Sequence, residues 1–289
     1  MVRGYRPVGL RIFLVCFGLW MMGETGCAVN RPEQKVSPLR VGKYPVLVIA
    51  HRGFSGTAPE NTLIAFKKAL DLGVDMIELD VHLSKDGEVV VIHDDTLNRT
   101  TNGKGKVAEF TLKELKQLEA GSFFSPHFSE ERIPTLKEAL ELVEGRAALI
   151  IELKKGEGSR YTLIDLADRA FQEAEKMGML NQVLFVSFEL SAIERIRERN
   201  PHVPVALNYG KDWNFPAEIT GGKPIPILSC RAGVLNQSNL SRAHKQGIRV
   251  FAWTLNTEEE MKQFLNMGIE GIITDHPDRL IKILQKRNP

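Results

Sequence analysis

The chain has 289 residues, and its hydrophobic content of 43% and charged content of 26% are typical of a globular protein. This length allows one large domain or two small ones. The formal net charge is only +2 and the basic residues are spread along the chain, which argues against nucleic acid as a partner.

The N-terminal residues have the pattern of an export signal. Three arginines precede an apolar stretch at residues 12–22, which is too short to span a bilayer comfortably. The small residue before Cys27 resembles a bacterial lipoprotein processing site, although Glu24 stands where an apolar residue is usual. We therefore predict a signal peptide at residues 1–27, of the lipoprotein type, with an ordinary cleaved signal or an uncleaved anchor as alternatives. The protein is then exported, periplasmic or extracytoplasmic, and held at the membrane by this segment or by lipid on Cys27.

The rest of the chain divides into a tether and a domain. Residues 28–44 are polar and lack periodicity, which indicates a flexible tether, and residues 45–289 form the domain. Apolar runs typical of buried strands lie near residues 46–50, 74–80, 147–153, 182–187, 203–207, 225–229, 248–254 and 270–274. Helical patterns lie near residues 60–72, 135–144, 160–177, 189–199, 236–246 and 257–267. This alternation predicts an α/β fold, a TIM-type (β/α)8 barrel, with a loop at residues 213–222 and Cys230 as a packed small hydrophobic residue.

One further apolar run breaks the alternation of strands and helices. Residues 88–93 follow the second strand after a turn that is too short for a helical crossover, and the Asp86-Gly87 pair favours a hairpin. A hairpin centred near Asp86 places His93 roughly opposite Asp80. The barrel is therefore expected to carry a hairpin and a small insertion near residues 84–133.

The insertion contains a short aromatic segment. We expect most of its phenylalanines, Phe123, Phe124 and Phe128, to form a small satellite core. The alternative is that they shape substrate access, as insertions at the catalytic face of a barrel often do.

Three acidic residues stand at predicted strand ends. Glu78 and Asp80 are two positions apart and share one face of their strand, and Glu152 ends another strand. Three carboxylates that converge at a barrel mouth repel one another unless a divalent cation lies between them, and oxygen ligands suit Mg²⁺, Ca²⁺ or Mn²⁺ better than zinc. The alternative is that each carboxylate pairs with a lysine or an arginine.

Cationic and imidazole side chains stand at the same strand ends. Arg52 offers a planar fork for a phosphate or carboxylate, and Lys154 adds a second positive charge. His51 and His93 are candidates for a general acid and a general base near neutral pH. This set of groups predicts metal-assisted phosphoryl transfer.

An ordered series of motifs resembles the glycerophosphodiester phosphodiesterase family, whose barrel is of the PLC-like phosphodiesterase kind. The resemblance covers nearly all of residues 46–280. Its motifs are His51-Arg52-Gly53, Pro59-Glu60-Asn61-Thr62, Glu78-Leu79-Asp80-Val81, Asp86-Gly87, His93-Asp94-Asp95, Leu97-Asn98-Arg99-Thr100-Thr101, Ile133-Pro134-Thr135-Leu136, Ile151-Glu152-Leu153-Lys154, Trp253-Thr254-Leu255-Asn256 and Thr274-Asp275-His276-Pro277. The resemblance implies hydrolysis of glycerophosphodiesters to an alcohol and sn-glycerol 3-phosphate, with water or the substrate's own 2-hydroxyl as the nucleophile.

The resemblance also implies roles for individual residues. His51 and His93 would be the acid/base pair, Arg52 and Lys154 would contact phosphate, and one divalent cation, Mg²⁺ or Ca²⁺, would be held by Glu78, Asp80 and Glu152. Four further residues each have more than one interpretation. Glu60 is a further metal ligand, or an orienting partner of His51, or a favourable charge at a helix N-terminus, and Asn61 contacts substrate or caps that helix. Trp253 lines the glycerol pocket or packs, and Asp275 supports the site or belongs to a turn.

Three other functions compete with this hypothesis. A lysophospholipase D-type enzyme would apply the same chemistry to membrane lysophospholipids. A non-catalytic surface lipoprotein would be expected to lack some of the histidines or carboxylates, and the chain has them all. An unrelated metal-dependent barrel hydrolase acting on sugars would have no need of Arg52 and Lys154.

Overall fold

The structure is a computed structural model, and it describes residues 42–211 and 225–287 besides Met1. The predicted signal peptide, nearly all of the predicted tether and the predicted loop at 213–222 lie outside the described residues. Among the residues that are described, no helix is long and apolar enough to cross a membrane.

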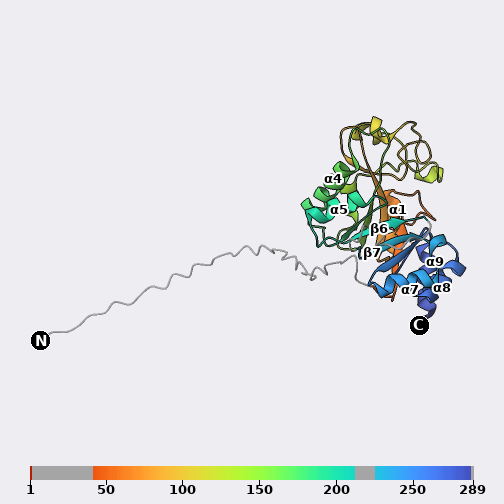
Figure 1. The fold of residues 1–289 in the computed structure, drawn as a ribbon. Coiled ribbons are helices and arrows are strands. Elements are labelled where there is room, and N and C mark those ends of the chain that lie inside the picture. The colour runs from red at the N-terminus through yellow and green to blue at the C-terminus, as the bar shows by residue number, and fades with distance from the viewer. Residues whose placement is uncertain (2–41, 212–224, 288–289) are drawn as a thin grey trace. The chain divides into compact units, whose positions relative to one another are not determined.

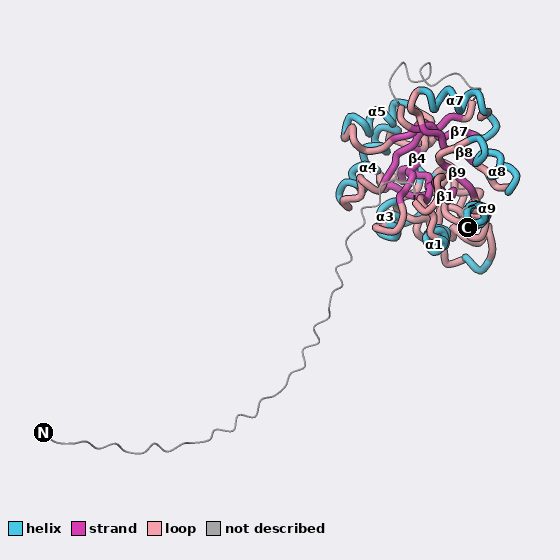
Figure 2. The backbone as a smooth tube through the Cα atoms, turned by 90° about the horizontal axis from the view of Figure 1, so that it is seen from below, coloured by secondary structure: helices cyan, strands magenta, loops and turns pink. Residues whose placement is uncertain are grey.

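The described chain forms a closed barrel of parallel strands, as the sequence predicts. The strands of the barrel are β1 (Leu47–His51), β2 (Met76–Leu83), β4 (Ala148–Leu153), β5 (Val183–Ser187), β6 (Val205–Tyr209), β7 (Ile227–Arg231), β8 (Arg249–Trp253) and β9 (Gly271–Thr274). Neighbours pair in parallel in the order β1-β9-β8-β7-β6-β5-β4-β2, and the pairing of β1 with β2 closes the ring. In Figure 2 the strands lie at the centre and the helices surround them.

Helices follow the strands and cover the outside of the barrel (Figure 1). They are α1 (Leu63–Leu72), α3 (Leu136–Val143), α4 (Leu163–Lys176), α5 (Leu190–Arg199), α7 (Gln237–Lys245), α8 (Glu258–Met267) and α9 (Pro277–Arg287). The first helix starts at residue 63 and not at residue 60 as predicted, because Thr62 is its N-cap and Asn61 has a left-handed backbone with φ of 57°. Gly73 ends the same helix with φ of 74°, a conformation that glycine adopts without strain.

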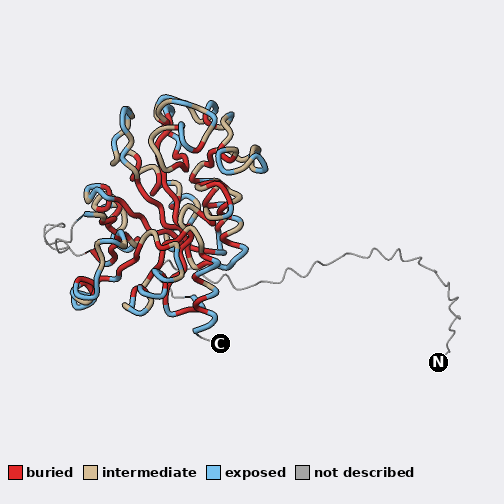
Figure 3. The backbone as a smooth tube through the Cα atoms, turned by 90° about the vertical axis from the view of Figure 1, so that its right-hand side faces the viewer, coloured by how far each residue is buried: buried red, intermediate tan, exposed pale blue. Residues whose placement is uncertain are grey.

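The alternation of side chains along each strand produces two apolar layers. Val48 and Ala50 of β1 face the helices, whereas Leu47 and Ile49 face the barrel interior. The interior layer is completed by Met76, Ala148, Ile150, Leu184, Val186, Ala206, Ile227, Phe251 and Ile273. These layers account for the buried strands at the centre of Figure 3, and Cys230 is buried among the outer set, as predicted.

A hairpin extends the barrel at β2. The short strand β3 (Val89–Val91) pairs antiparallel with β2, and Val81 lies opposite Val91. Backbone N–H of Ile92 then donates to the carbonyl oxygen of Asp80 at 3.0 Å. His93 therefore follows the residue that lies opposite Asp80, one position from the predicted register.

The insertion after the hairpin has a core of its own. Its short helices are η1 (Val107–Glu109), α2 (Leu112–Leu115) and η2 (Pro126–Phe128), and they lie at one end of the barrel, in the yellow part of Figure 1. Its buried core consists of Val90, Ile92, Leu97, Val107, Leu115, Ala120 and Ile133. The prediction for the phenylalanines is therefore wrong in its residues: Phe123 and Phe124 are exposed, because the aliphatic side chains already fill this core.

Candidate active site

The site lies at the carboxyl ends of the barrel strands, just beyond the apolar layer that fills the barrel interior. On β1 the interior residue Ile49 is followed two positions later by His51, and on β4 Ile150 is followed by Glu152 and then Lys154. Because side chains alternate with a period of two, these polar groups point to the barrel axis beyond the core. The register places His51 beside Glu78 and Asp80 beside Glu152.

Three carboxylates form a buried cluster at this end of the barrel. Glu78, Asp80 and Glu152 are each at most 9% exposed, and one oxygen atom of each lies within 4.8 Å of an oxygen atom of the other two. Oδ1 of Asp80 is buried and accepts no hydrogen bond from the described residues. An orphaned carboxylate oxygen among three buried acids fits a divalent cation, because such a cation prefers oxygen ligands and offsets their repulsion.

The pKa values of these three carboxyl groups are shifted by burial and by neighbouring charges. Burial, followed by the charges of Asp80 and Glu152, raises the pKa of Glu78 well above its ordinary value. Burial and the charge of Asp80 likewise raise the pKa of Glu152 to about 7. Burial opposes ionisation of Asp80 too, but Arg52 and Lys154 outweigh it and lower the pKa of Asp80 to about 2. Asp80 is therefore the acid of the cluster that ionises most readily, and Glu78 and Glu152 ionise less readily than isolated carboxyl groups.

Arg52 is held against the acidic cluster by its backbone and its side chain. Its backbone φ of 55° lies in the left-handed region, and its N–H donates to Oε2 of Glu78 at 3.0 Å. Its Nε lies 3.4 Å from Oδ2 of Asp80, and its Nη1 donates to Oε1 of Glu60 at 2.6 Å. The guanidinium group is therefore fixed beside the acidic cluster.

His51 is oriented by Asp275. The imidazole Nδ1 lies 2.6 Å from Oδ1 of Asp275, which also accepts from the hydroxyl of Ser55 at 2.9 Å. The amide of Asn256 donates to the other carboxylate oxygen at 2.6 Å. Burial raises the pKa of Asp275, but the hydrogen bond and charge of His51 outweigh it, so this pKa lies well below its usual range. Because a carboxylate can only accept, the Nδ1 atom carries the proton and Nε2 is left for chemistry.

His93 is oriented by the next residue in the chain, Asp94, as His51 is by Asp275. Its Nδ1 lies 2.7 Å from Oδ1 of Asp94, and its Nε2 lies 3.0 Å from Nζ of Lys154. Burial, together with the positive charges of Arg52 and Lys154, lowers the pKa of His93. An ammonium group can only donate, so Nε2 of His93 accepts and Nδ1 donates to Asp94. The two histidines are thus set in the same tautomer by two separate aspartates.

Lys154 reaches into the acidic cluster. Its Nζ lies 3.3 Å from Oε1 of Glu152 and 3.6 Å from Oδ1 of Asp80. Burial opposes its charge, but these two carboxylates raise the pKa of Lys154 above its ordinary value. The lysine therefore carries a permanent positive charge beside His93.

Glu60 and Asn61 make side-chain contacts that the sequence does not predict. Both oxygens of Glu60 accept from arginines, Arg52 on one side and Arg99 on the other, so Glu60 is not a member of the acidic cluster and does not contact His51. Asn61 neither caps the helix nor lines the central cavity: its amide donates to Oδ2 of Asp80 at 2.9 Å. The physical reason is the left-handed turn at Asn61, which points this side chain to the carboxylate.

A central cavity of about 190 Å³ joins these groups. It is lined by His51, Arg52, Glu78, His93, Ile150, Glu152, Lys154, Val186, Phe188, Asn208, Ser229, Trp253 and Ile273. Trp253 packs edge-on against Phe188, and its buried Nε1 has no hydrogen-bond partner among the described residues. Asn208 and Ser229 are paired in register, and both are buried. The cavity therefore presents polar groups beyond the charged ones.

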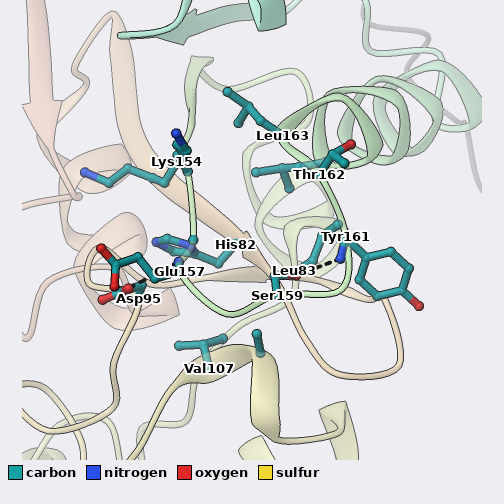
Figure 4. Close-up of a pocket in the computed structure, with 14 residues that line it drawn as sticks. His82, Leu83, Asp95, Val107, Lys154, Glu157, Ser159, Tyr161, Thr162 and Leu163 are labelled. Atoms are coloured by element: carbon teal, nitrogen blue, oxygen red, sulfur yellow. Dashed lines mark hydrogen bonds between the residues drawn. The ribbon is translucent and has the colours of Figure 1, made fainter.

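A second cavity of about 260 Å³ adjoins the first at Lys154. In Figure 4 His82 lies between Lys154 and the pair formed by Asp95 and Glu157, and the ring of Tyr161 points away from them. Nε2 of His82 lies 3.1 Å from the backbone oxygen of His93, so His82 supports the segment that carries the second histidine.

The structure brings together most of the residues that the sequence singles out. Seven of them line the central cavity, and they are His51, Arg52, Glu78, His93, Glu152, Lys154 and Trp253. Sequence reasoning missed Asn208 and Ser229, although each stands two positions after an interior apolar residue, at Ala206 and Ile227, as the predicted site residues do. The sequence also does not predict that Arg99 pairs with Glu60, because no local pattern indicates this contact.

The closed barrel with acids, histidines and cations at one end defines the class of this protein, an enzyme for phosphate-ester chemistry. Comparison with known proteins then gives the family. The model of the glycerophosphoryl diester phosphodiesterase family matches residues 51–279. The chain belongs to this family and is a glycerophosphodiester phosphodiesterase, so the resemblance inferred from the motifs and the predicted barrel are both confirmed.

Individual relatives agree with this assignment. The chain is 38% identical over 245 residues to a glycerophosphodiester phosphodiesterase of Caldanaerobacter subterraneus subsp. tengcongensis, with 83% of this chain and 98% of the relative covered. A glycerophosphodiester phosphodiesterase of Bacillus altitudinis is also 38% identical over 245 residues, with the same coverage. Among solved structures, a phosphodiesterase of Oleispira antarctica in complex with the product sn-glycerol-3-phosphate has a TM-score of 0.74 and 31% identity, covering 84% of this chain and 97% of that one.

Proposed function

We propose that this enzyme hydrolyses small glycerophosphodiesters to an alcohol and sn-glycerol 3-phosphate, with one divalent cation and two histidines. The observation that carries the proposal is the cluster of Glu78, Asp80 and Glu152. Two of its members, Glu78 and Glu152, line the same cavity as His51 and His93. The product in the Oleispira antarctica relative supports the substrate class.

The acidic cluster would hold the cation, Mg²⁺ or Ca²⁺. Its donor atoms are all carboxylate oxygens, and the orphaned Oδ1 of Asp80 is available as a ligand. A bound cation supplies Lewis-acid polarisation of a phosphoryl oxygen and stabilises the negative charge that develops there. Asn61 fixes Asp80 through its other oxygen, which keeps the carboxylate oriented.

Arg52 and Lys154 would bind the non-bridging oxygens of the phosphate. The guanidinium of Arg52 is preorganised by Glu60, so little side-chain freedom is lost when the substrate arrives. Lys154 lines the same cavity, and its Nζ lies within reach of both Glu152 and His93. Two fixed positive charges beside the phosphate stabilise a transition state with more charge on its oxygens.

The histidines would move the protons. One Nε2 atom takes a proton from the nucleophile, which is water or the glycerol 2-hydroxyl, as its oxygen forms a bond to phosphorus. The bond from phosphorus to the alcohol oxygen breaks, and the other histidine, which enters the step as an imidazolium, gives that oxygen the proton of its Nε2. If the 2-hydroxyl attacks, water then opens the cyclic phosphate, so both routes consume one water and give the same products. Asp275 and Asp94 stabilise each imidazolium as it forms.

The polar groups in the cavity wall favour a water-soluble diester over a lysophospholipid. Asn208 and Ser229 lie beside each other in the cavity wall, so glycerol hydroxyls would find hydrogen-bond partners there, and Trp253 lines the same cavity.

Release of glycerol 3-phosphate from glycerophosphocholine and from other glycerophosphodiesters tests this function. We expect turnover with these substrates and much less with a lysophospholipid of the same head group. A preference for the lysophospholipid would favour the lysophospholipase D alternative, and no release from any diester would overturn the proposal.

We further propose that the protein is exported and anchored at the membrane through residues 1–27 or lipid on Cys27. This proposal rests on the sequence pattern alone. Mass spectrometry of the mature N-terminus tests it: a lipidated Cys27 as first residue is the expected result, and an unprocessed Met1 in a cytoplasmic fraction would contradict it.

A further inference from the structure

Arg99 connects two parts of the site without lining the central cavity. Its Nε and Nη2 donate to the two oxygens of Asp94 at 2.8 and 3.0 Å. Its Nη1 and Nη2 donate to the two oxygens of Glu60 at 2.7 and 2.9 Å. One guanidinium group thus makes four hydrogen bonds to two carboxylates, each of them held at both oxygens.

Each of these carboxylates holds a residue of the proposed mechanism. Asp94 accepts from Nδ1 of His93, and Glu60 accepts from Nη1 of Arg52 at 2.6 Å. The contacts form an unbroken chain that runs from His93 through Asp94, Arg99 and Glu60 to Arg52. An acid/base group and a phosphate-binding group are therefore fixed by a single arginine.

We propose that Arg99 is a positioning residue that fixes the imidazole of His93 and the guanidinium of Arg52 relative to each other. Only a planar fork with donors on three nitrogens can serve both carboxylates at once. The side chain of Arg99 is 45% exposed, so its four hydrogen bonds do little to fold the protein, and their geometry is the main effect. The inference rests on the proposed function, because it assigns His93 to proton transfer and Arg52 to phosphate.

A split between kcat and KM tests this role. Without Arg99, Asp94 is free to turn and the imidazole of His93 loses its orientation, which lowers kcat. Glu60 also loses its second arginine, so the guanidinium of Arg52 is held less firmly at the phosphate position, which raises KM. We expect Arg99→Met to change both constants, and kcat/KM to fall by a factor of about 10–100, the usual cost of losing an outer-shell partner.

Single changes at the two carboxylates separate the two effects. Asp94→Asn is expected to lower kcat with little change in KM, and Glu60→Gln to raise KM with less change in kcat. Arg99→Lys is expected to remain impaired, because one ammonium group cannot replace a fork that binds two carboxylates. Low, non-denaturing concentrations of guanidinium ion are expected to restore part of the activity of Arg99→Ala.

Arg146→Met is the matched control. Arg146 is also 45% exposed and also pairs with a carboxylate, Asp71, but far from the site in the fold. Both arginine variants should keep the thermal midpoint of the wild type within a few degrees. Wild-type kcat and KM in Arg99→Met, or full activity in Arg99→Lys, would overturn the inference while leaving the proposed function intact. If the wild-type enzyme releases no glycerol 3-phosphate from any glycerophosphodiester, the proposed function itself is overturned.

Discussion

Nδ1 of His51 lies 2.6 Å from Oδ1 of Asp275, a residue 224 positions later in the chain. The contact joins the first strand of the barrel to the end of the last, and it exists only because β1 and β9 pair when the ring closes. Asn256 and Ser55 hold the carboxylate in place. Closure of the barrel therefore fixes the tautomer of a proposed catalytic histidine.

Asp275→Asn is expected to lower kcat by a factor of about 10²–10⁴ with a smaller effect on KM, because an amide at this position no longer enforces the proton on Nδ1 or stabilises the imidazolium. Steady-state kinetics with a glycerophosphodiester measure both constants. Asp278→Asn, at an exposed position of α9, is the control, and equal kinetics in the two variants would contradict the assigned role.

His51→Ala and His93→Ala are each expected to lower turnover by a factor of about 10²–10⁴, the typical loss when a general acid or base is removed. Turnover at saturating substrate measures the effect, with circular dichroism to show that the variants fold. His127→Ala, in the exposed helix η2, should behave as the wild type. Near-full activity in either site variant would remove that histidine from the mechanism.

Divalent cations are expected to stabilise the folded protein, because they bind a carboxylate cluster that exists only after folding. At a free cation concentration of about 100 times Kd, the gain in unfolding free energy is about 2.7 kcal/mol. Thermal melts with Mg²⁺ or Ca²⁺ and with EDTA measure it, and Glu152→Gln should reduce the shift. Identical melts in cation and in chelator would argue against a site at Glu78, Asp80 and Glu152.

Glu173 on α4 is expected to destabilise the protein at alkaline pH. Burial and then the charge of Glu88 raise the pKa of Glu173 to about 7, and its Oε2 has no hydrogen-bond partner among the described residues. The folded state binds this proton more tightly than the unfolded chain, so the contribution to stability is present below about pH 4.5 and is lost as the pH rises to about 7.

Glu173→Gln should therefore raise the free energy of unfolding at pH 8, by on the order of 1 kcal/mol. Urea denaturation at pH 5 and pH 8 measures the gain, which should be smaller at pH 5. Glu144→Gln, at the exposed end of α3, is the control. A gain of the same size at both pH values would show that the charge of Glu173 is not its cause.

The sequence predicts the barrel and much of the site because both depend on a short period. Apolar residues at alternate positions mark the interior of each strand, and the polar residue two positions later then points to the axis, as at Glu152 after Ile150. The same rule, applied to the weaker strands, would have identified Asn208 and Ser229. The predicted register of the hairpin is one residue off because His93 lies just beyond the last paired position.

The roles of Glu60, Asn61 and Arg99 could not be predicted in the same way. Each depends on side-chain contacts between segments whose relative position is set by the whole barrel and its insertion. Glu60 precedes a helix, which suggests a helix-terminal charge, but the insertion brings Arg99 to it. Asn61 is next to the N-cap in sequence, and its left-handed backbone turns it to Asp80.

The most direct test of the central claim is a metal titration of the chelated enzyme that follows release of sn-glycerol 3-phosphate from a glycerophosphodiester. The account predicts no turnover after thorough chelation, a saturable return of turnover with Mg²⁺ or Ca²⁺, and a higher cation requirement in Glu152→Gln. Undiminished turnover in the chelated enzyme, or a titration that Glu152→Gln leaves unchanged, would contradict it.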